Sequence, residues 1–93
     1  MEDKARAHVI ISGRVQGVFF RMETQQAAES YGVCGWVKNR RDGRVEAIFE
    51  GDADCVDRMI EWCRKGSAMS EVQKVDVNWE VYSGEFTGFD VTY

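Results

Sequence analysis

The stretch Ser12-Gly13-Arg14-Val15-Gln16-Gly17-Val18-Phe19-Phe20-Arg21 decides the fold of this chain. Before it, residues 7–11 are rich in apolar and β-branched side chains, which predicts a buried strand over about residues 6–14. After it, apolar residues recur at helical spacing and Gly32 stands where a helix ends, so a helix is expected over about residues 21–31. The stretch is therefore a turn from a strand into a helix.

The start of this helix lacks the usual capping residue. The first helical turn has backbone N–H groups without intrahelical partners, and a Ser, Thr, Asp or Asn side chain normally satisfies one of them. No such residue lies between Gly13 and Phe20, and the segment contains no proline. An anion bound by the free N–H groups would take the place of the cap. The spacing alone also fits a tight turn whose glycines only relieve strain, because it matches neither the Walker loop nor the dinucleotide-binding pattern.

The middle of the chain predicts a hairpin followed by a second helix. Residues 33–39 and 44–50 have strand composition and are joined at Asp42-Gly43, a strong hairpin signal. The second helix begins with the capping composition Asp52-Ala53-Asp54 and ends before Gly66. Its expected apolar face consists of Val56, Met59, Ile60 and Cys63.

Two further strands follow a polar connection over residues 67–73. Residues 74–81 alternate, with four apolar residues on one face: Val75, Val77, Trp79 and Val81. A short fifth strand is formed by Phe89, Val91 and Tyr93. The order strand-helix-strand-strand-helix-strand predicts an α+β sandwich in which an antiparallel sheet carries both helices on one face. We expect the loop after the first strand and the far end of the second strand to approach each other, so that four polar residues converge: Arg14, Arg21, Lys38 and Asn39. We also expect Trp36 and Trp79 to belong to the core.

Length and composition favour one domain over residues 1–93. A hydrophobic share of 44% with 30% charged residues is typical of a soluble globular protein. No apolar run approaches the roughly 20 residues that a membrane span needs. The charged start, Met1-Glu2-Asp3-Lys4, is not followed by a signal-type apolar run. We therefore expect a cytoplasmic monomer with no membrane partner.

The charge is distributed unevenly along the chain. The net charge of −4 argues against a nucleic-acid partner. Residues 1–46 carry eight Lys and Arg against six Asp and Glu, a balance of +2, whereas residues 47–93 carry four against ten, a balance of −6. A local basic region on an acidic protein favours a small anion over a polymer.

The three cysteines predict neither a metal site nor a nucleophile. Cys34, Cys55 and Cys63 lack metal-ligand spacing and read as thiols in a reducing compartment. We expect Cys63 to lie in the core. A catalytic thiol would need a base, and the single histidine, His8, lies in the first strand, far from all three in sequence.

Three motifs resemble those of the acylphosphatase family. They are Gly13-Arg-Val-Gln-Gly-Val-Phe-Phe-Arg21, Gly35-Trp-Val-Lys-Asn39 and Asp42-Gly-Arg-Val-Glu46. The likeness covers nearly the whole chain and departs from the family at residues 66–68, where many relatives have a Gly-Pro-Pro turn and this chain has Gly-Ser-Ala. The resemblance implies a ferredoxin-like βαββαβ sandwich with a short fifth C-terminal strand. It also implies hydrolysis of the carboxyl-phosphate bond of acyl phosphates.

The resemblance implies the roles of the site residues as well. Arg21 is expected to bind the phosphoryl group and Asn39 to position the attacking water, so these are the catalytic residues. The phosphate-binding loop supplies the backbone amides of Val15, Gln16, Gly17, Val18, Phe19 and Phe20. No metal and no organic cofactor is implied, and inorganic phosphate or sulfate is expected to inhibit.

The chemistry is consistent with these residues. An acyl phosphate expels the base of an acid with a pKa of about 4, so the leaving carboxylate needs no general acid. Fixed amides and a planar guanidinium can bind the phosphoryl oxygens, and an asparagine can accept a hydrogen bond from water.

The sequence is also compatible with purely structural roles for these residues and with other functions. Arg21 and Arg14 could be exposed side chains, and Asn39 could only begin the hairpin turn. An RNA-binding domain shares the same element order, but the 44–50 strand lacks its aromatic pattern. A non-catalytic anion sensor could use the same loop. Acetyl, carbamoyl and glyceroyl phosphates all fit as substrates.

Overall fold

The computed structural model describes residues 3–93, and Met1 and Glu2, part of the charged start noted above, lie outside the described residues. These described residues form two helices and five strands. In order, they are β1 (Lys4–Arg14), α1 (Phe20–Tyr31), β2 (Cys34–Asn39), β3 (Val45–Asp52), α2 (Ala53–Lys65), β4 (Glu71–Glu80) and β5 (Phe89–Thr92).

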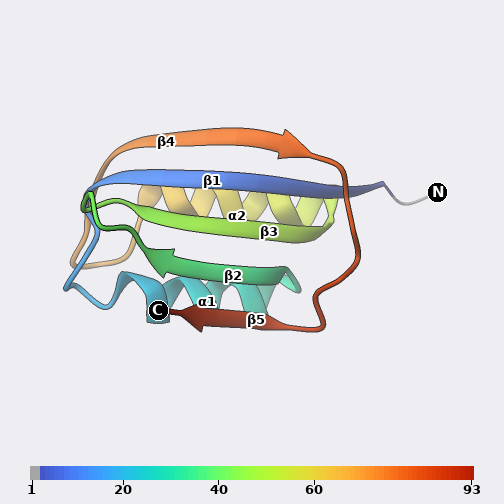
Figure 1. The fold of residues 1–93 in the computed structure, drawn as a ribbon, viewed down its shortest axis with the longest axis horizontal. Coiled ribbons are helices and arrows are strands. Elements are labelled where there is room, and N and C mark those ends of the chain that lie inside the picture. The colour runs from blue at the N-terminus through green and yellow to red at the C-terminus, as the bar shows by residue number, and fades with distance from the viewer. Residues whose placement is uncertain (1–2) are drawn as a thin grey trace.

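The strands form one sheet with the order β4-β1-β3-β2-β5. β1 pairs antiparallel with β3 and β4, and β2 pairs antiparallel with β3. Both helices cover the same face of this sheet (Figure 1). The expected ferredoxin-like sandwich is thus confirmed. The fifth strand pairs parallel with β2, which makes the sheet mixed.

The register brings three chain segments to one end of the sheet. Val45 pairs with Ile11 of β1 on one side and with Asn39 of β2 on the other. Lys38 pairs with Thr92 at the end of β5. The loop after β1, the hairpin after β2 and the C-terminus therefore meet at this end (Figure 1).

The core lies between the sheet and the two helices. Phe20 of α1 is buried and its ring centroid lies 5.6 Å from that of Trp62 in α2. The ring of Phe49 in β3 stacks on that of Phe89 in β5, with the centroids 5.8 Å apart. Burial of each such ring stabilises the fold by roughly 1.5–3 kcal/mol. Cys63 is fully buried, as expected.

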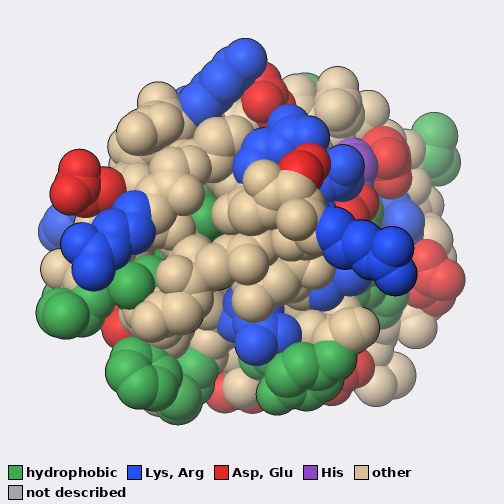
Figure 2. Space-filling view, turned by 60° about the vertical axis from the view of Figure 1, so that its left-hand side comes forward, with side chains coloured by type: hydrophobic (Ala, Val, Ile, Leu, Met, Phe, Trp, Pro, Cys, Tyr) green, Lys and Arg blue, Asp and Glu red, His purple; other side chains and the backbone are tan. Residues whose placement is uncertain are grey.

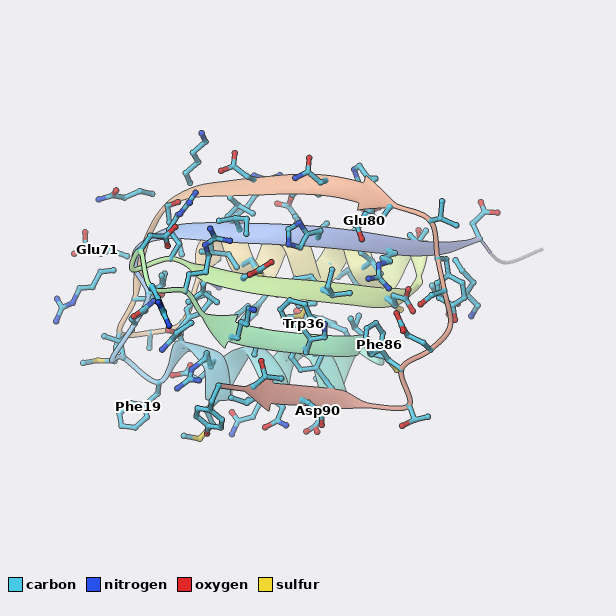
Figure 3. All side chains as sticks on the ribbon, in the orientation of Figure 1. Phe19, Trp36, Glu71, Glu80, Phe86 and Asp90 are labelled. Atoms are coloured by element: carbon cyan, nitrogen blue, oxygen red, sulfur yellow. The ribbon has the colours of Figure 1, made fainter. Side chains whose placement is uncertain are left out.

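Two tryptophans depart from the expectation that they belong to the core. Trp79 is 56% exposed, because β4 is an edge strand and α2 covers only part of its inner face. Trp36 is partly exposed on the face of β2 opposite the helices, where its ring lies 5.5 Å from the Lys38 ammonium (Figure 3). Alternation along a strand predicts which face of the sheet a side chain lies on, but not how much of that face a helix covers.

Two local features also differ from the expected pattern. β4 begins at Glu71, within the segment expected to be a polar connection, because an edge strand tolerates polar residues. It meets β1 at an irregularity where Gly13 has φ 127, and a Cβ at Gly13 would lie 2.2 Å from the carbonyl oxygen of Glu71. Asp52 stands at the N-cap of α2 but makes no capping hydrogen bond, and its carboxylate binds the Lys4 ammonium instead.

No helix within residues 3–93 has the length and apolar character that crossing a membrane requires.

Candidate active site

A cavity of about 430 Å³ opens where the loop after β1, the start of α1 and the ends of β2 and β5 meet. Six of the residues singled out from the sequence line it: Val15, Gly17, Phe19, Phe20, Arg21 and Asn39. Four more were not anticipated: Met22, Gln25, Val91 and Tyr93. The two expected catalytic residues thus share one cavity.

The loop after β1 is anchored by its apolar side chains, and its backbone faces the cavity. Val15 and Val18 are buried in the core, whereas Gly17 and Phe19 are exposed. Gly17 has φ 73 with open space where a side chain would be. Within residues 3–93, the N–H groups of residues 16–19 donate none of the backbone–backbone hydrogen bonds that lie outside helices and strands. These donors are free to bind a ligand.

The start of α1 is uncapped, as the sequence indicated. Phe19 is the N-cap residue, has the left-handed conformation with φ 60, and makes no side-chain capping hydrogen bond. The helix N-terminus therefore presents a partial positive charge and unsatisfied N–H groups at the cavity.

Gln16 fixes the loop to the hairpin. Its side-chain amide donates hydrogen bonds to the carbonyl oxygens of Arg40 and Arg44, at 2.8 Å and 2.9 Å. Because Arg40 directly follows Asn39, these bonds set the position of the loop relative to Asn39.

Arg21 lies in the first turn of α1 and is oriented by the C-terminal strand. Its Nη1 donates a hydrogen bond to the carbonyl oxygen of Thr92 at 3.0 Å. Its guanidinium carbon lies 4.7 Å from the centroid of the Tyr93 ring, a cation–π distance. A guanidinium has five N–H donors, so others stay available for an anion.

Asn39 ends β2 with an unsatisfied acceptor. Within the described part of the chain, its side-chain Oδ1 is buried and has no hydrogen-bond partner. A buried acceptor without a partner costs about 1–3 kcal/mol. A water molecule or ligand that donates to Oδ1 would recover this free energy.

Arg14 and Lys38 do not join Arg21 in the cavity, contrary to expectation. Arg14 is exposed at the end of β1. Lys38 lines a neighbouring cavity of about 660 Å³ and lies 3.9 Å from the carboxylate of Glu46. Alternation along β2 explains the position of Lys38, because adjacent residues of a strand point to opposite faces.

The neighbouring cavity is basic and adjoins the first through Asn39 and Tyr93. Arg40 and Arg41 line it together with Asp42. The side chain of Arg44, its backbone N–H and the Arg40 guanidinium hold the pKa of Asp42 well below its usual range, although partial desolvation opposes this shift. Figure 2 shows Lys and Arg side chains spread over this end of the molecule, with hydrophobic side chains exposed among them.

The cysteines lie outside the cavity lining. Cys63 is fully buried in α2, and burial raises the pKa of its thiol far above its ordinary value, so it is not poised as a nucleophile. Within residues 3–93, no cluster of three or more His, Cys, Asp or Glu side chains has an arrangement that could hold a metal ion.

Sequence reasoning missed the contribution of Gln25 and of the C-terminal strand. Gln25 lies four residues after Arg21, on the same face of α1, and donates to the carbonyl oxygen of Phe89 at 2.9 Å. That helical spacing could have identified it. Val91 and Tyr93 could be placed only with the parallel pairing of β5 known.

Comparison with known proteins identifies close relatives. A family model described as Acylphosphatase matches residues 7–91. The chain is 63% identical to an acylphosphatase of Syntrophobacter fumaroxidans over 91 residues, covering 98% of this chain and 94% of that protein. It is 50% identical to an acylphosphatase of Pelotomaculum thermopropionicum, with 97% and 98% covered. The crystal structure of acylphosphatase from Bacillus subtilis superposes with a TM-score of 0.92 at 36% identity, covering 96% of this chain and 99% of that chain.

Proposed function

Because the chain belongs to the acylphosphatase family, we propose that it hydrolyses the carboxyl-phosphate bond of acyl phosphates to a carboxylate and inorganic phosphate. One observation carries the mechanism: an uncapped helix start, the Arg21 guanidinium and the unpartnered Oδ1 of Asn39 all border one cavity. The first two can bind a phosphoryl group, and the third can bind the water that attacks it.

The loop amides and Arg21 bind the phosphoryl group in this mechanism. The N–H groups of residues 15–20 and the dipole of α1 offer fixed partial positive charges, which need no reorganisation as charge shifts between the oxygens. Arg21 adds a full charge and a planar pair of donors. The Thr92 carbonyl and the Tyr93 ring support its orientation.

Asn39 positions the attacking water. Oδ1 accepts a hydrogen bond from that water, whose oxygen attacks phosphorus in line with the bond to the acyl oxygen. The bond from phosphorus to the acyl oxygen breaks and its electron pair stays on the leaving carboxylate. The proton of the water passes to a phosphoryl oxygen of the substrate, because an amide is not a base.

A metal-free reaction by a cytoplasmic monomer is also part of the proposal. The groups that line the cavity are guanidinium, amide, phenol and apolar groups, and none of the residues that line it is Asp, Glu, His or Cys. Three free cysteines suit a reducing compartment. Inorganic phosphate and sulfate, which resemble the bound group, should inhibit competitively.

The test is phosphate release from acetyl phosphate with and without a chelator, with a sugar phosphate as a second substrate. We expect acetyl phosphate to be hydrolysed equally in both conditions. The sugar phosphate should be hydrolysed poorly, because its alkoxide leaving group needs a proton donor. Binding of phosphate without turnover would instead indicate an anion sensor. Loss of turnover in chelator, restored by a divalent metal, would contradict the metal-free mechanism.

A further inference from the structure

Phe19 combines two unfavourable features. Within residues 3–93 it is the single non-glycine residue with a positive φ, and its side chain is 69% exposed. Glycine or asparagine adopts this conformation at lower energy, and a polar residue would cost less in water. Strain of this kind persists at functional sites. The ring points outward at the loop end of the molecule (Figure 3).

Met22 extends the apolar surface that Phe19 begins. It lies in the first turn of α1, three residues further on, and is 49% exposed. Both residues line the cavity that holds Arg21 and Asn39. That cavity, at about 430 Å³, lies in the range of pockets that enclose whole small molecules, roughly 300–1,000 Å³, so it has room beyond a phosphoryl group.

In the proposed mechanism, in-line attack leaves the acyl group on the side of the cavity away from the water at Asn39. In an in-line displacement, the leaving group lies across phosphorus from the attacking water. Water held by Asn39 enters from the end of β2, whereas Phe19 and Met22 come from the start of α1. The basic cavity around Arg41 adjoins Asn39 itself, on the side of the water, and so does not suit the acyl group.

We propose that Phe19 and Met22 form the binding surface for the acyl group. They give the enzyme a preference for acyl phosphates with a long alkyl or aromatic acyl group. This inference rests on the proposed hydrolysis of acyl phosphates. Contact with the acyl chain covers the exposed ring and thioether, which accounts for apolar side chains at the mouth of an anion site.

The test compares kcat/KM for hexanoyl phosphate with kcat/KM for acetyl phosphate. The two substrates release carboxylates of similar basicity and differ in alkyl length, so their ratio reports apolar contact and cancels changes in phosphate binding. The variants are Met22→Ala and Phe19→Gly. The control is Met69→Ala, which removes another exposed methionine, 64% exposed, that lies outside the cavity lining.

We expect the ratio to fall about fivefold to tenfold in Phe19→Gly and less in Met22→Ala, because each removes an apolar contact. Met69→Ala should keep the wild-type ratio. Glycine accepts the positive φ, so Phe19→Gly should not lower the melting temperature. An unchanged ratio in both variants, or an equal loss for both substrates, would overturn the inference while wild-type turnover still supported the proposed function. Absence of wild-type turnover with acetyl phosphate would refute the proposed function itself.

Discussion

Arg21 is a cation at the end of a helix where backbone dipoles disfavour one. The carbonyl of Thr92 and the ring of Tyr93 offset part of this cost. A bound anion would offset the rest, since it would interact with the guanidinium and the helix N-terminus together. The residue is thus stabilised most when the site is filled.

Substitution of Arg21 should therefore impair both phosphate binding and turnover. Loss of one charged donor pair from a confined site lowers kcat/KM by roughly a hundredfold to a thousandfold, so we expect this for Arg21→Ala. Arg21→Lys should recover only part, because an ammonium lacks the planar fork. The measurement is kcat/KM for acetyl phosphate and the inhibition constant of phosphate. Arg14→Ala is the matched control, as it removes an exposed arginine outside the cavity. Full activity of Arg21→Ala would contradict the role of the guanidinium.

At the residue scale, the sequence predicted the candidate site residues better than it predicted which side chains lie together. The motifs pointed to Arg21 and Asn39, which share the cavity. The grouping of Arg14 and Lys38 with them was wrong, because charge along the chain does not say which face of a strand a side chain occupies. The buried Oδ1 of Asn39 depends on packing by other segments, and no local pattern reports it.

At the scale of elements, Glu50 fixes the connection from β4 to β5. Its carboxylate is 2% exposed in β3 and accepts hydrogen bonds from the backbone N–H and hydroxyl of Ser83, both at 2.8 Å. The N–H of Gly84 and the Arg6 guanidinium donate to it at 3.1 Å. The connection passes beside the ends of β1, β3 and β2 before β5 begins (Figure 1). Glu50 therefore helps to position the strand that orients Arg21.

This network makes stability sensitive to acid. Burial raises the pKa of Glu50, but the hydrogen bonds from Ser83, Arg6 and Gly84 outweigh it, so the pKa lies below its ordinary value. The stabilisation is fully present above the pKa of an unfolded glutamate, about 4.3, and is lost as the pH falls through the lower pKa of the folded state.

We expect Glu50→Gln to lose about 1–3 kcal/mol of unfolding free energy at pH 7, because it weakens several hydrogen bonds to a buried group. The variant should also lose part of the decline in stability that wild type shows below the ordinary glutamate pKa. Urea unfolding at neutral and acid pH measures both effects. Glu61→Gln, at an exposed position of α2, is the control. An identical pH dependence in Glu50→Gln and wild type would contradict this account.

The elements themselves were predictable because local patterns and packing agree. The helices, the hairpin and the first three strands occur close to where periodicity placed them. The start of β4 was missed, since Glu71 and Gln73 are polar on an edge strand. The parallel direction of β5 was missed too, because it depends on how the residue 81–88 connection is held and not on the alternation of Phe89 and Val91.

At the scale of the whole molecule, an acidic protein has a basic end. The net charge is −4, yet the loop after β1 and the hairpin that carries the arginines lie together at one end of the sheet (Figure 1). We expect such a charge distribution to favour local binding of small anions, while the overall charge disfavours polyanions. An anion held by this folded loop would bind the folded state alone.

Phosphate or sulfate should therefore raise the melting temperature. At about 100 times its dissociation constant, a ligand that binds only the folded state adds about 2.7 kcal/mol to the unfolding free energy. A thermal melt against sulfate concentration measures this, with chloride at equal ionic strength as the control. The shift should disappear in Arg21→Ala. Equal shifts by sulfate and chloride would show general screening in place of a specific site.

We propose above all that Arg21 binds the phosphoryl group whereas Asn39 positions the attacking water, and Asn39→Ala tests this difference most directly. The measurement is turnover of acetyl phosphate by this variant, made together with the inhibition constant of inorganic phosphate. The loop amides and Arg21 stay in place when Asn39 is shortened, so phosphate should inhibit as it does in wild type, while kcat falls steeply because the water is no longer aligned. A variant that turns over acetyl phosphate at the wild-type rate, or that loses phosphate affinity as Arg21→Ala does, would contradict the assignment of water to Asn39.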